Sequence, residues 1–190
     1  MTSRPVLYFD LGSPYAYLAT ARAAAVLGGE PELEPVLLGA IFQWRGHGSW
    51  SQTGERERHF AEIERRAAAY GLPPVAWPPG WPGDGLSAMR AATWAKGQGA
   101  IAAFAHAAYR RAFVEGHDVG PLDTLAGICA EVGLDDGAMR AAIRTDAIKD
   151  RLRATTTAAW DAGVRGVPTL AAGGATYYGD DRLEDAAAAI

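Results

Sequence analysis

Two short apolar runs flank an alanine-rich stretch near the start of the chain. Residues 6–10 are rich in β-favouring side chains, and residues 33–38 form a second such run. Between them, residues 15–27 predict a helix that ends at the glycine pair 28–29. Ser13 and Pro14 precede this helix, and they favour its N-cap and first turn. We therefore expect a strand, a helix and a second strand in a right-handed βαβ unit.

The middle of the chain has helical spacing of its apolar residues, interrupted by two irregular segments. Residues 39–54 predict a loop, and residues 72–85 hold several prolines, which exclude a regular helix or a central strand there. The remaining segments predict five helices, over residues 55–70, 87–95, 100–115, 121–132 and 136–144.

The last part of the chain returns to mixed elements. Residues 146–162 predict a helix, and two strands, 167–172 and 175–178, follow it with a glycine pair between them that favours a hairpin. The acidic pair 180–181 precedes a last helix. The whole order predicts an α/β, thioredoxin-like fold with an inserted all-helical domain. We expect a discontinuous thioredoxin-like domain, residues 1–41 and 146–190, and a helical insertion, residues 42–145.

Composition and charge narrow the class of protein. The net charge of −4 and the lack of a basic stripe argue against nucleic acid or an anionic membrane as the partner. We find no leader-like segment and no apolar run long enough to span a membrane, so we expect a cytoplasmic location. The single cysteine, Cys129, excludes an internal disulfide. The histidines show no metal-ligand spacing, so we expect no metal.

Ser13 and the Val167-Pro168 pair are the first candidates for a site. Ser13 is at least a helix cap, but a helix N-terminus also stabilises a thiolate, and the serine hydroxyl can donate to it. Val167-Pro168 is at least a strand opener. With a cis bond it would also expose a backbone edge on which a peptide-like ligand can pair. Because a serine stands where a redox protein would have its first cysteine, we expect the site to bind a borrowed thiol.

Asp180 and Asp181 also allow two interpretations. They cap the last helix, or they bind an ammonium group while the helix N-terminus beside them binds a carboxylate. An amino-acid group carries both charges, so this pair suits the γ-glutamyl end of glutathione. The tryptophans in the irregular segments either fill small hydrophobic cores or form a wall for a flat aromatic substrate. The four are Trp44, Trp50, Trp77 and Trp81.

Three segments, residues 9–18, 163–169 and 178–183, resemble the 2-hydroxychromene-2-carboxylate isomerase family. That family is close to the kappa-class glutathione transferases and belongs to the DsbA-like thioredoxin superfamily. The resemblance implies that Ser13 hydrogen-bonds the glutathione sulfur and that Val167 and Pro168 hold the cysteinyl unit. It implies further that Asp180 and Asp181 bind the γ-glutamyl group and that the protein is a homodimer.

One segment departs from the family pattern. Family members use an Asn and a Lys or Arg at the start of the insertion, whereas residues 45–50 contain no Asn. The substitutes we expect on the cofactor side are Arg56, His47 and Ser49. We expect Tyr15 to join the tryptophans on the substrate side.

The favoured function is an isomerase, dependent on glutathione or another low-molecular-weight thiol, that acts on a small aromatic or unsaturated compound by thiolate addition and elimination. The alternatives are a kappa-like glutathione transferase or peroxidase, and a non-catalytic binding module for a thiol ligand. A dithiol oxidoreductase is excluded, because residues 13–16 contain no cysteine.

Overall fold

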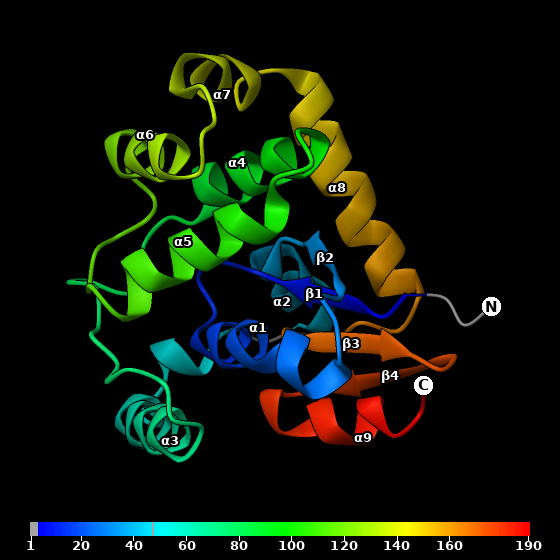
Figure 1. The fold of residues 1–190 in the computed structure, drawn as a ribbon. Coiled ribbons are helices and arrows are strands. Elements are labelled where there is room, and N and C mark those ends of the chain that lie inside the picture. Colours follow the sequence, from blue (N-terminus) through cyan, green and yellow to red (C-terminus); the bar gives the residue numbers. More distant parts are fainter. Residues whose placement is uncertain (1–3, 47) are drawn as a thin grey trace.

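The computed structural model describes residues 4–46 and 48–190, and its centre is a four-stranded sheet. The strands are β1 (Val6–Phe9), β2 (Glu32–Pro35), β3 (Thr169–Ala172) and β4 (Ala175–Tyr178). Their order is β2-β1-β3-β4, with β1 parallel to β2 and antiparallel to β3, and β4 antiparallel to β3 (Figure 1). The predicted α/β, thioredoxin-like class is confirmed.

The sheet register aligns one row of buried leucines. Leu7 on β1 lies opposite Leu33 on β2 and Leu170 on β3. All three side chains are buried. Since alternate residues of a strand point to opposite faces, a shift of one residue would turn this row out of the core.

The first helix, α1 (Pro14–Leu27), begins as its sequence predicts. Ser13 is the N-cap, and its Oγ accepts the backbone N–H of Ala16 at 3.2 Å. The helix ends at Gly28, whose φ of 71° lies in the left-handed region that glycine adopts without strain. These two local signals fix both ends of α1, and so place the Ser13 hydroxyl at the carboxyl end of β1.

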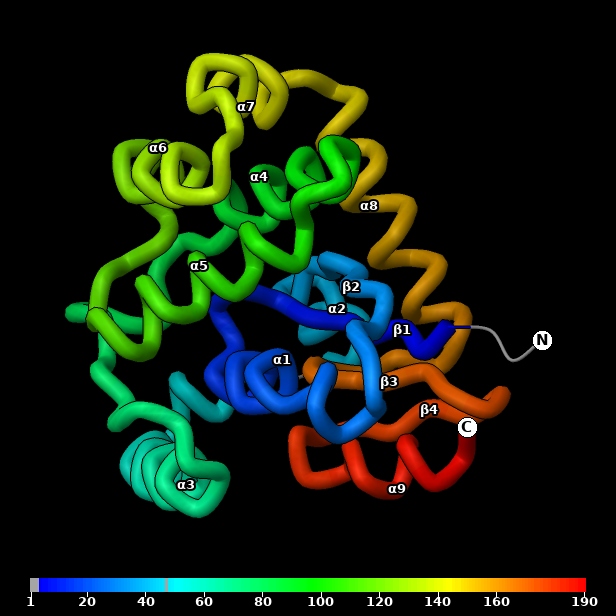
Figure 2. The backbone as a smooth tube through the Cα atoms, in the orientation of Figure 1, coloured from blue at the N-terminus to red at the C-terminus, as the bar shows by residue number. Residues whose placement is uncertain are grey.

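Between β2 and β3 the chain is helical. The helices are α2 (Leu38–Arg45), α3 (Arg56–Ala69), α4 (Leu86–Gly97), α5 (Ile101–Phe113), α6 (Leu122–Glu131), α7 (Asp136–Ala142) and α8 (Asp146–Asp161), with a 3₁₀ turn, η1 (Trp50–Gln52). Figure 2 traces this path from β2 through the helices and back along α8 to β3. A second 3₁₀ turn, η2 (Asp180–Arg182), and α9 (Leu183–Ala187) end the fold. In the described part of the chain no helix is long and apolar enough to cross a bilayer.

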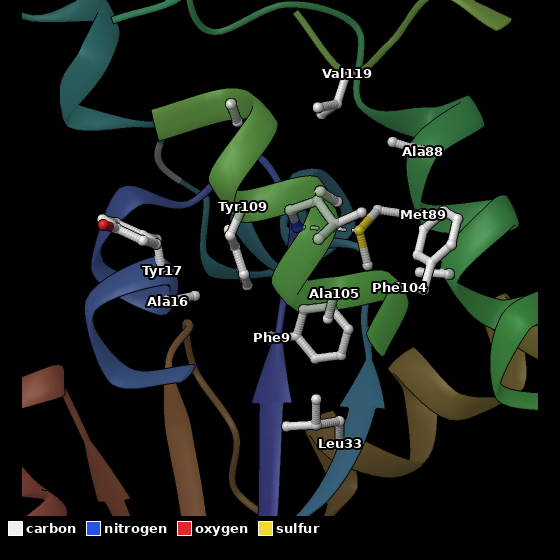
Figure 3. Close-up of a cluster of buried hydrophobic side chains, with 14 of the residues drawn as sticks. Phe9, Ala16, Tyr17, Leu33, Ala88, Met89, Phe104, Ala105, Tyr109 and Val119 are labelled. Carbon is white, nitrogen blue, oxygen red and sulfur yellow. Dashed lines mark hydrogen bonds between the residues drawn. The ribbon is translucent and has the colours of Figure 1, made fainter. Parts of the chain in front are cut away.

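One buried cluster joins the sheet to the helical block. Phe9 of β1 packs edge-on against Tyr109 of α5, with ring centroids 6.2 Å apart (Figure 3). Met89 of α4 and Phe104 of α5 are fully buried in the same cluster as Leu33. The sequence predicts domain boundaries at residues 41–42 and 145–146. The buried core extends over both sides of these boundaries, because the sheet and the helical block contribute to one cluster. Those boundaries stay a prediction.

The prediction of a loop over residues 39–54 is wrong for its first half, because α2 occupies that part of the chain. No side chain caps α2 and Gly39 lies in its first turn, so local signals for a helix are weak. Tertiary contacts replace them. The buried carboxylate of Asp10 accepts the N–H of Leu38 at 2.9 Å, and the hydroxyl of Thr156 accepts the N–H of Leu37 at 3.0 Å. β2 accordingly ends at Pro35, three residues earlier than predicted.

Candidate active site

A cavity of about 790 Å³ opens where the start of α1 meets the segments before β3 and after β4. Ser13, Val167, Pro168 and the acidic pair 180–181 all line it. This volume lies within the range of small-molecule binding sites in proteins. Residues that lie some 150 positions apart in the sequence thus share one cavity, as their pattern predicts.

Ser13 lies in the wall of this cavity. Its residue is only 5% exposed, and its backbone carbonyl accepts the N–H of Tyr17 at 3.1 Å. The peptide bond between Val167 and Pro168 is cis, as expected. The first N–H groups of α1 and the partial positive charge of the helix terminus lie at the same place as the Ser13 hydroxyl. This corner of the cavity is therefore suited to an anion or a thiolate.

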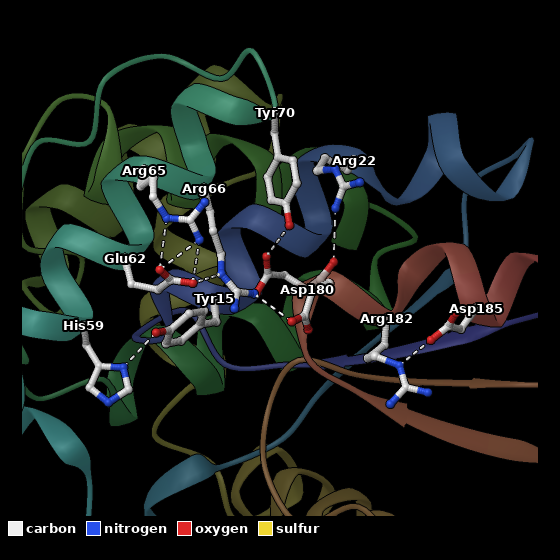
Figure 4. A network of polar contacts seen from close by, with 11 residues as sticks. Tyr15, Arg22, His59, Glu62, Arg65, Arg66, Tyr70, Asp180, Arg182 and Asp185 are labelled. Atoms are coloured by element: carbon white, nitrogen blue, oxygen red, sulfur yellow. Dashed lines mark hydrogen bonds and ion pairs between the residues drawn. The ribbon is translucent and has the colours of Figure 1, made fainter.

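The two carboxylates of the acidic pair have different environments, and Figure 4 shows that of Asp180. Asp180 is 1% exposed, and its two carboxylate oxygens accept hydrogen bonds from Arg66 at 2.9 Å and from Tyr70 at 3.0 Å. Burial raises the pKa of the Asp180 carboxyl, and the charge of Arg66 opposes that shift. The side chain of Asp181 is 53% exposed, with one oxygen 3.2 Å from Arg66. Asp181 is thus the carboxylate of the pair that is accessible to a ligand, and Asp180 holds the turn in place.

Two of the four candidate tryptophans line the cavity. Trp50 and Trp81 do, with ring centroids 5.3 Å apart, and the indole N–H of Trp81 donates to the carbonyl of Gly12 at 3.1 Å. Trp77 lies outside the cavity, because its ring stacks on the ring of Phe60, with centroids 3.7 Å apart. Trp44 is 43% exposed and packs on Trp160. The substrate roles predicted for Trp44 and Trp77 therefore have no support from their positions.

The basic residues expected on the cofactor side do not all line the cavity. Arg56 does not line the cavity; its guanidinium donates to the carbonyl of Trp81 at 2.6 Å and so supports the aromatic wall from behind. His47 lies outside the described residues. Arg45, at the end of α2, does line the cavity and donates to the carbonyl of Arg165 at 2.9 Å. In the described residues no group of three histidine, cysteine or acidic side chains is placed to hold a metal ion.

Tyr15 and His59 form a pair in the cavity wall. The sequence predicts Tyr15 in the site but gives no signal for His59. The Tyr15 hydroxyl lies 2.7 Å from Nδ1 of His59, and both residues line the cavity (Figure 4). The imidazole of His59 stacks on the ring of Trp50, with centroids 4.3 Å apart. Since His59 is one histidine on a polar helix with no motif around it, its role becomes visible only when α3 is placed beside α1.

The single cysteine lies elsewhere. Cys129 is fully buried in α6 and is not among the residues that line the cavity. Burial raises the pKa of its thiol to about 11. A thiol of that pKa is almost entirely protonated at neutral pH and is a poor nucleophile.

Comparisons with known proteins agree with this geometry. The DSBA-like thioredoxin domain family matches residues 6–190. The 2-hydroxychromene-2-carboxylate isomerase of Sphingobium xenophagum is 30% identical over 191 residues, covering 97% of this chain and 96% of that protein.

Solved structures show the same fold. A 2-hydroxychromene-2-carboxylate isomerase superposes with a TM-score of 0.84 at 23% identity, covering 94% of this chain and 90% of that one. The cytosolic disulfide reductase DsbM of Pseudomonas aeruginosa, solved with GSH, superposes with a TM-score of 0.66 at 19% identity, covering 97% and 95%. The sequence relative is similar over nearly its whole length. The chain therefore belongs to the DSBA-like thioredoxin family and, within it, to the family of 2-hydroxychromene-2-carboxylate isomerase.

Proposed function

We propose that this protein is an isomerase of 2-hydroxychromene-2-carboxylate or a closely similar aromatic compound, and that it depends on glutathione or a related small thiol. One observation carries the proposal: the N-terminus of α1, with Ser13 as its cap, faces the same cavity as Val167-Pro168 and Asp181. A relative of similar length that is named for this isomerisation supports the choice of reaction.

The cavity has suitable groups for the sulfur, the γ-glutamyl ammonium group and the peptide part of such a thiol. Ser13 and the free N–H groups of the first turn of α1 would hold the sulfur as thiolate. The exposed carboxylate of Asp181 would hold the ammonium group of the γ-glutamyl unit, and the backbone of Val167 would pair with the peptide part. When bound, glutathione supplies a nucleophile that adds reversibly to a conjugated carbon of the substrate.

The protein's own contribution is orientation and electrostatics. Trp50 and Trp81 give the cavity an aromatic wall that suits a flat bicyclic compound. The N-terminus of α1 favours negative charge before the substrate arrives, so no reorganisation is needed during the reaction. Cys129 has no part in this scheme, because it is buried away from the cavity.

A kappa-like transferase or peroxidase is the second candidate. The missing Asn in residues 45–50 favours it over the isomerase, and favours a non-catalytic binding module in the same way. One assay separates the two: the purified protein is incubated with the chromene and glutathione while free thiol is titrated. The isomerase consumes chromene at constant free thiol, whereas a transferase or peroxidase loses thiol as the reaction proceeds. Thermal stabilisation by glutathione without turnover of the chromene would identify a binding module instead.

Replacing Asp181 by Asn should weaken glutathione binding about fivefold, because an exposed charged contact contributes on the order of 1 kcal/mol. Calorimetric titration with glutathione measures this. Asp185→Asn is the matched control, since Asp185 is an exposed carboxylate of α9 that pairs with Arg182 and does not line the cavity. Equal affinities in the two variants would contradict the role of Asp181.

A further inference from the structure

The Tyr15–His59 pair is a polar contact in the cavity wall that neither the cofactor nor the aromatic wall explains. Tyr15 is in the first turn of α1, two residues after Ser13, and His59 is in the first turn of α3. Their Oη and Nδ1 atoms lie 2.7 Å apart, a normal length for a hydrogen bond that a proton can cross. The two groups border the cavity that the proposed substrate would fill.

The surroundings fix the resting protonation of the pair. Burial raises the pKa of Tyr15 to about 12, and burial, with the charge of Arg58, lowers the pKa of His59 below its usual value. At neutral pH the pair is thus a phenol and an uncharged imidazole. In the imidazole tautomer that carries its proton on Nε2, the Tyr15 hydroxyl donates to Nδ1. The other charged groups that face the pair are carboxylates and one guanidinium, namely Glu55, Glu62, Asp180 and Arg66.

The proposed substrate requires a proton transfer of its own. A 2-hydroxychromene is a cyclic hemiketal, so its hydroxyl and its ring oxygen are bonded to the same carbon. Opening this ring removes a proton from the hydroxyl and delivers one to the ring oxygen. Because both oxygens lie on one carbon, a single protein hydroxyl can reach both of them.

We propose that Tyr15 and His59 form the proton shuttle that opens the ring of the hemiketal substrate, an inference that rests on the proposed function. Tyr15 Oη takes the proton of the substrate hydroxyl while its own proton passes to Nδ1 of His59. The electron pair of the broken O–H bond becomes the second bond of the new carbonyl, and the ring C–O bond breaks with its pair on the ring oxygen. Tyr15 then protonates that oxygen and recovers its proton from His59, so one proton has moved between the two oxygens.

Two variants and two compounds test this role. Tyr15→Phe keeps the ring against Trp50 but has no hydroxyl, and His59→Asn keeps an acceptor for that hydroxyl but cannot store a proton. The first compound is 2-hydroxychromene-2-carboxylate. The second is its open-chain cis form with the phenol O-methylated, which cannot cyclise. His117→Asn is the control, because His117 is exposed and outside the cavity.

We expect chromene turnover to fall about 100-fold in Tyr15→Phe and in His59→Asn, the usual size of a lost acid–base group. Turnover of the open-chain compound should fall less than tenfold, and the thermal shift produced by glutathione should stay as in the unsubstituted protein. The wild-type kcat/KM for the chromene should also fall as the pH drops through the lowered pKa of His59, because protonated imidazole cannot accept the proton. His59→Asn should lose this limb of the pH profile.

The outcomes separate the shuttle from the function on which it rests. Wild-type turnover of the chromene by His59→Asn would overturn the shuttle and leave the isomerase intact. Equal losses on both compounds, in variants that melt like the wild type, would also overturn it, because they place the pair in binding. A wild-type protein inactive toward both compounds would refute the proposed function itself, and the shuttle with it.

Discussion

Replacing Ser13 by alanine should lower isomerase activity about 100-fold or more, the loss seen when one donor to a developing anion is removed. The hydroxyl lies at the N-terminus of α1 on the cavity wall, where it can donate to a bound thiolate. The same change removes the bond to the N–H of Ala16, so the free energy of unfolding should fall by only about 1 kcal/mol. Steady-state kinetics with chromene and glutathione, together with urea unfolding, measure both effects.

Thr145→Ala is the matched control for that experiment. Thr145 caps α8 and accepts the N–H of Ile148 at 3.4 Å, but it does not line the cavity. This variant should lose stability to a similar extent while keeping its activity. If Ser13→Ala also keeps full activity, Ser13 is a helix cap and the thiolate site must be placed elsewhere.

The parts of the fold that the sequence predicts well depend on local chemistry. Ser13 and Pro14 mark the start of α1, Gly28 marks its end, and the glycine pair 173–174 marks the hairpin between β3 and β4. The serine caps the helix with its side chain, the proline has a fixed φ, and the glycines adopt the left-handed backbone, so each signal is contained in a few neighbouring residues. The corner of the site formed by Ser13 and Val167-Pro168 could be predicted for another reason: the thioredoxin-like order of elements brings these two distant segments together.

The parts that the sequence does not predict depend on distant contacts. α2 begins where Asp10 and Thr156, from β1's end and α8, accept backbone N–H groups. Trp81 lines the cavity and Trp77 does not, although they lie four residues apart in one irregular segment. That difference is set by Phe60, which stacks on Trp77. Residue type indicates an aromatic wall, and only the packing of α3 decides which ring belongs to it.

Replacing Asp180 by alanine should lower the free energy of unfolding by about 3 kcal/mol, the usual cost of removing one partner from a buried charged pair. The change leaves the Arg66 guanidinium and the Tyr70 hydroxyl without the carboxylate that both contact. Arg66 keeps its ion pair with Glu62, so the loss should stay below the upper end of that range. Urea unfolding at neutral pH measures the effect.

Asp185→Ala is the control, because its pair with Arg182 is exposed and should contribute at most about 0.5 kcal/mol. Equal losses in the two variants would contradict a structural role for Asp180. The glutathione affinity of folded Asp180→Ala then decides between the two interpretations of the acidic pair. A large stability loss with a small change in affinity assigns turn formation to Asp180 and ligand binding to Asp181. This is the division expected when one carboxylate has both oxygens hydrogen-bonded within the protein and its neighbour is half exposed.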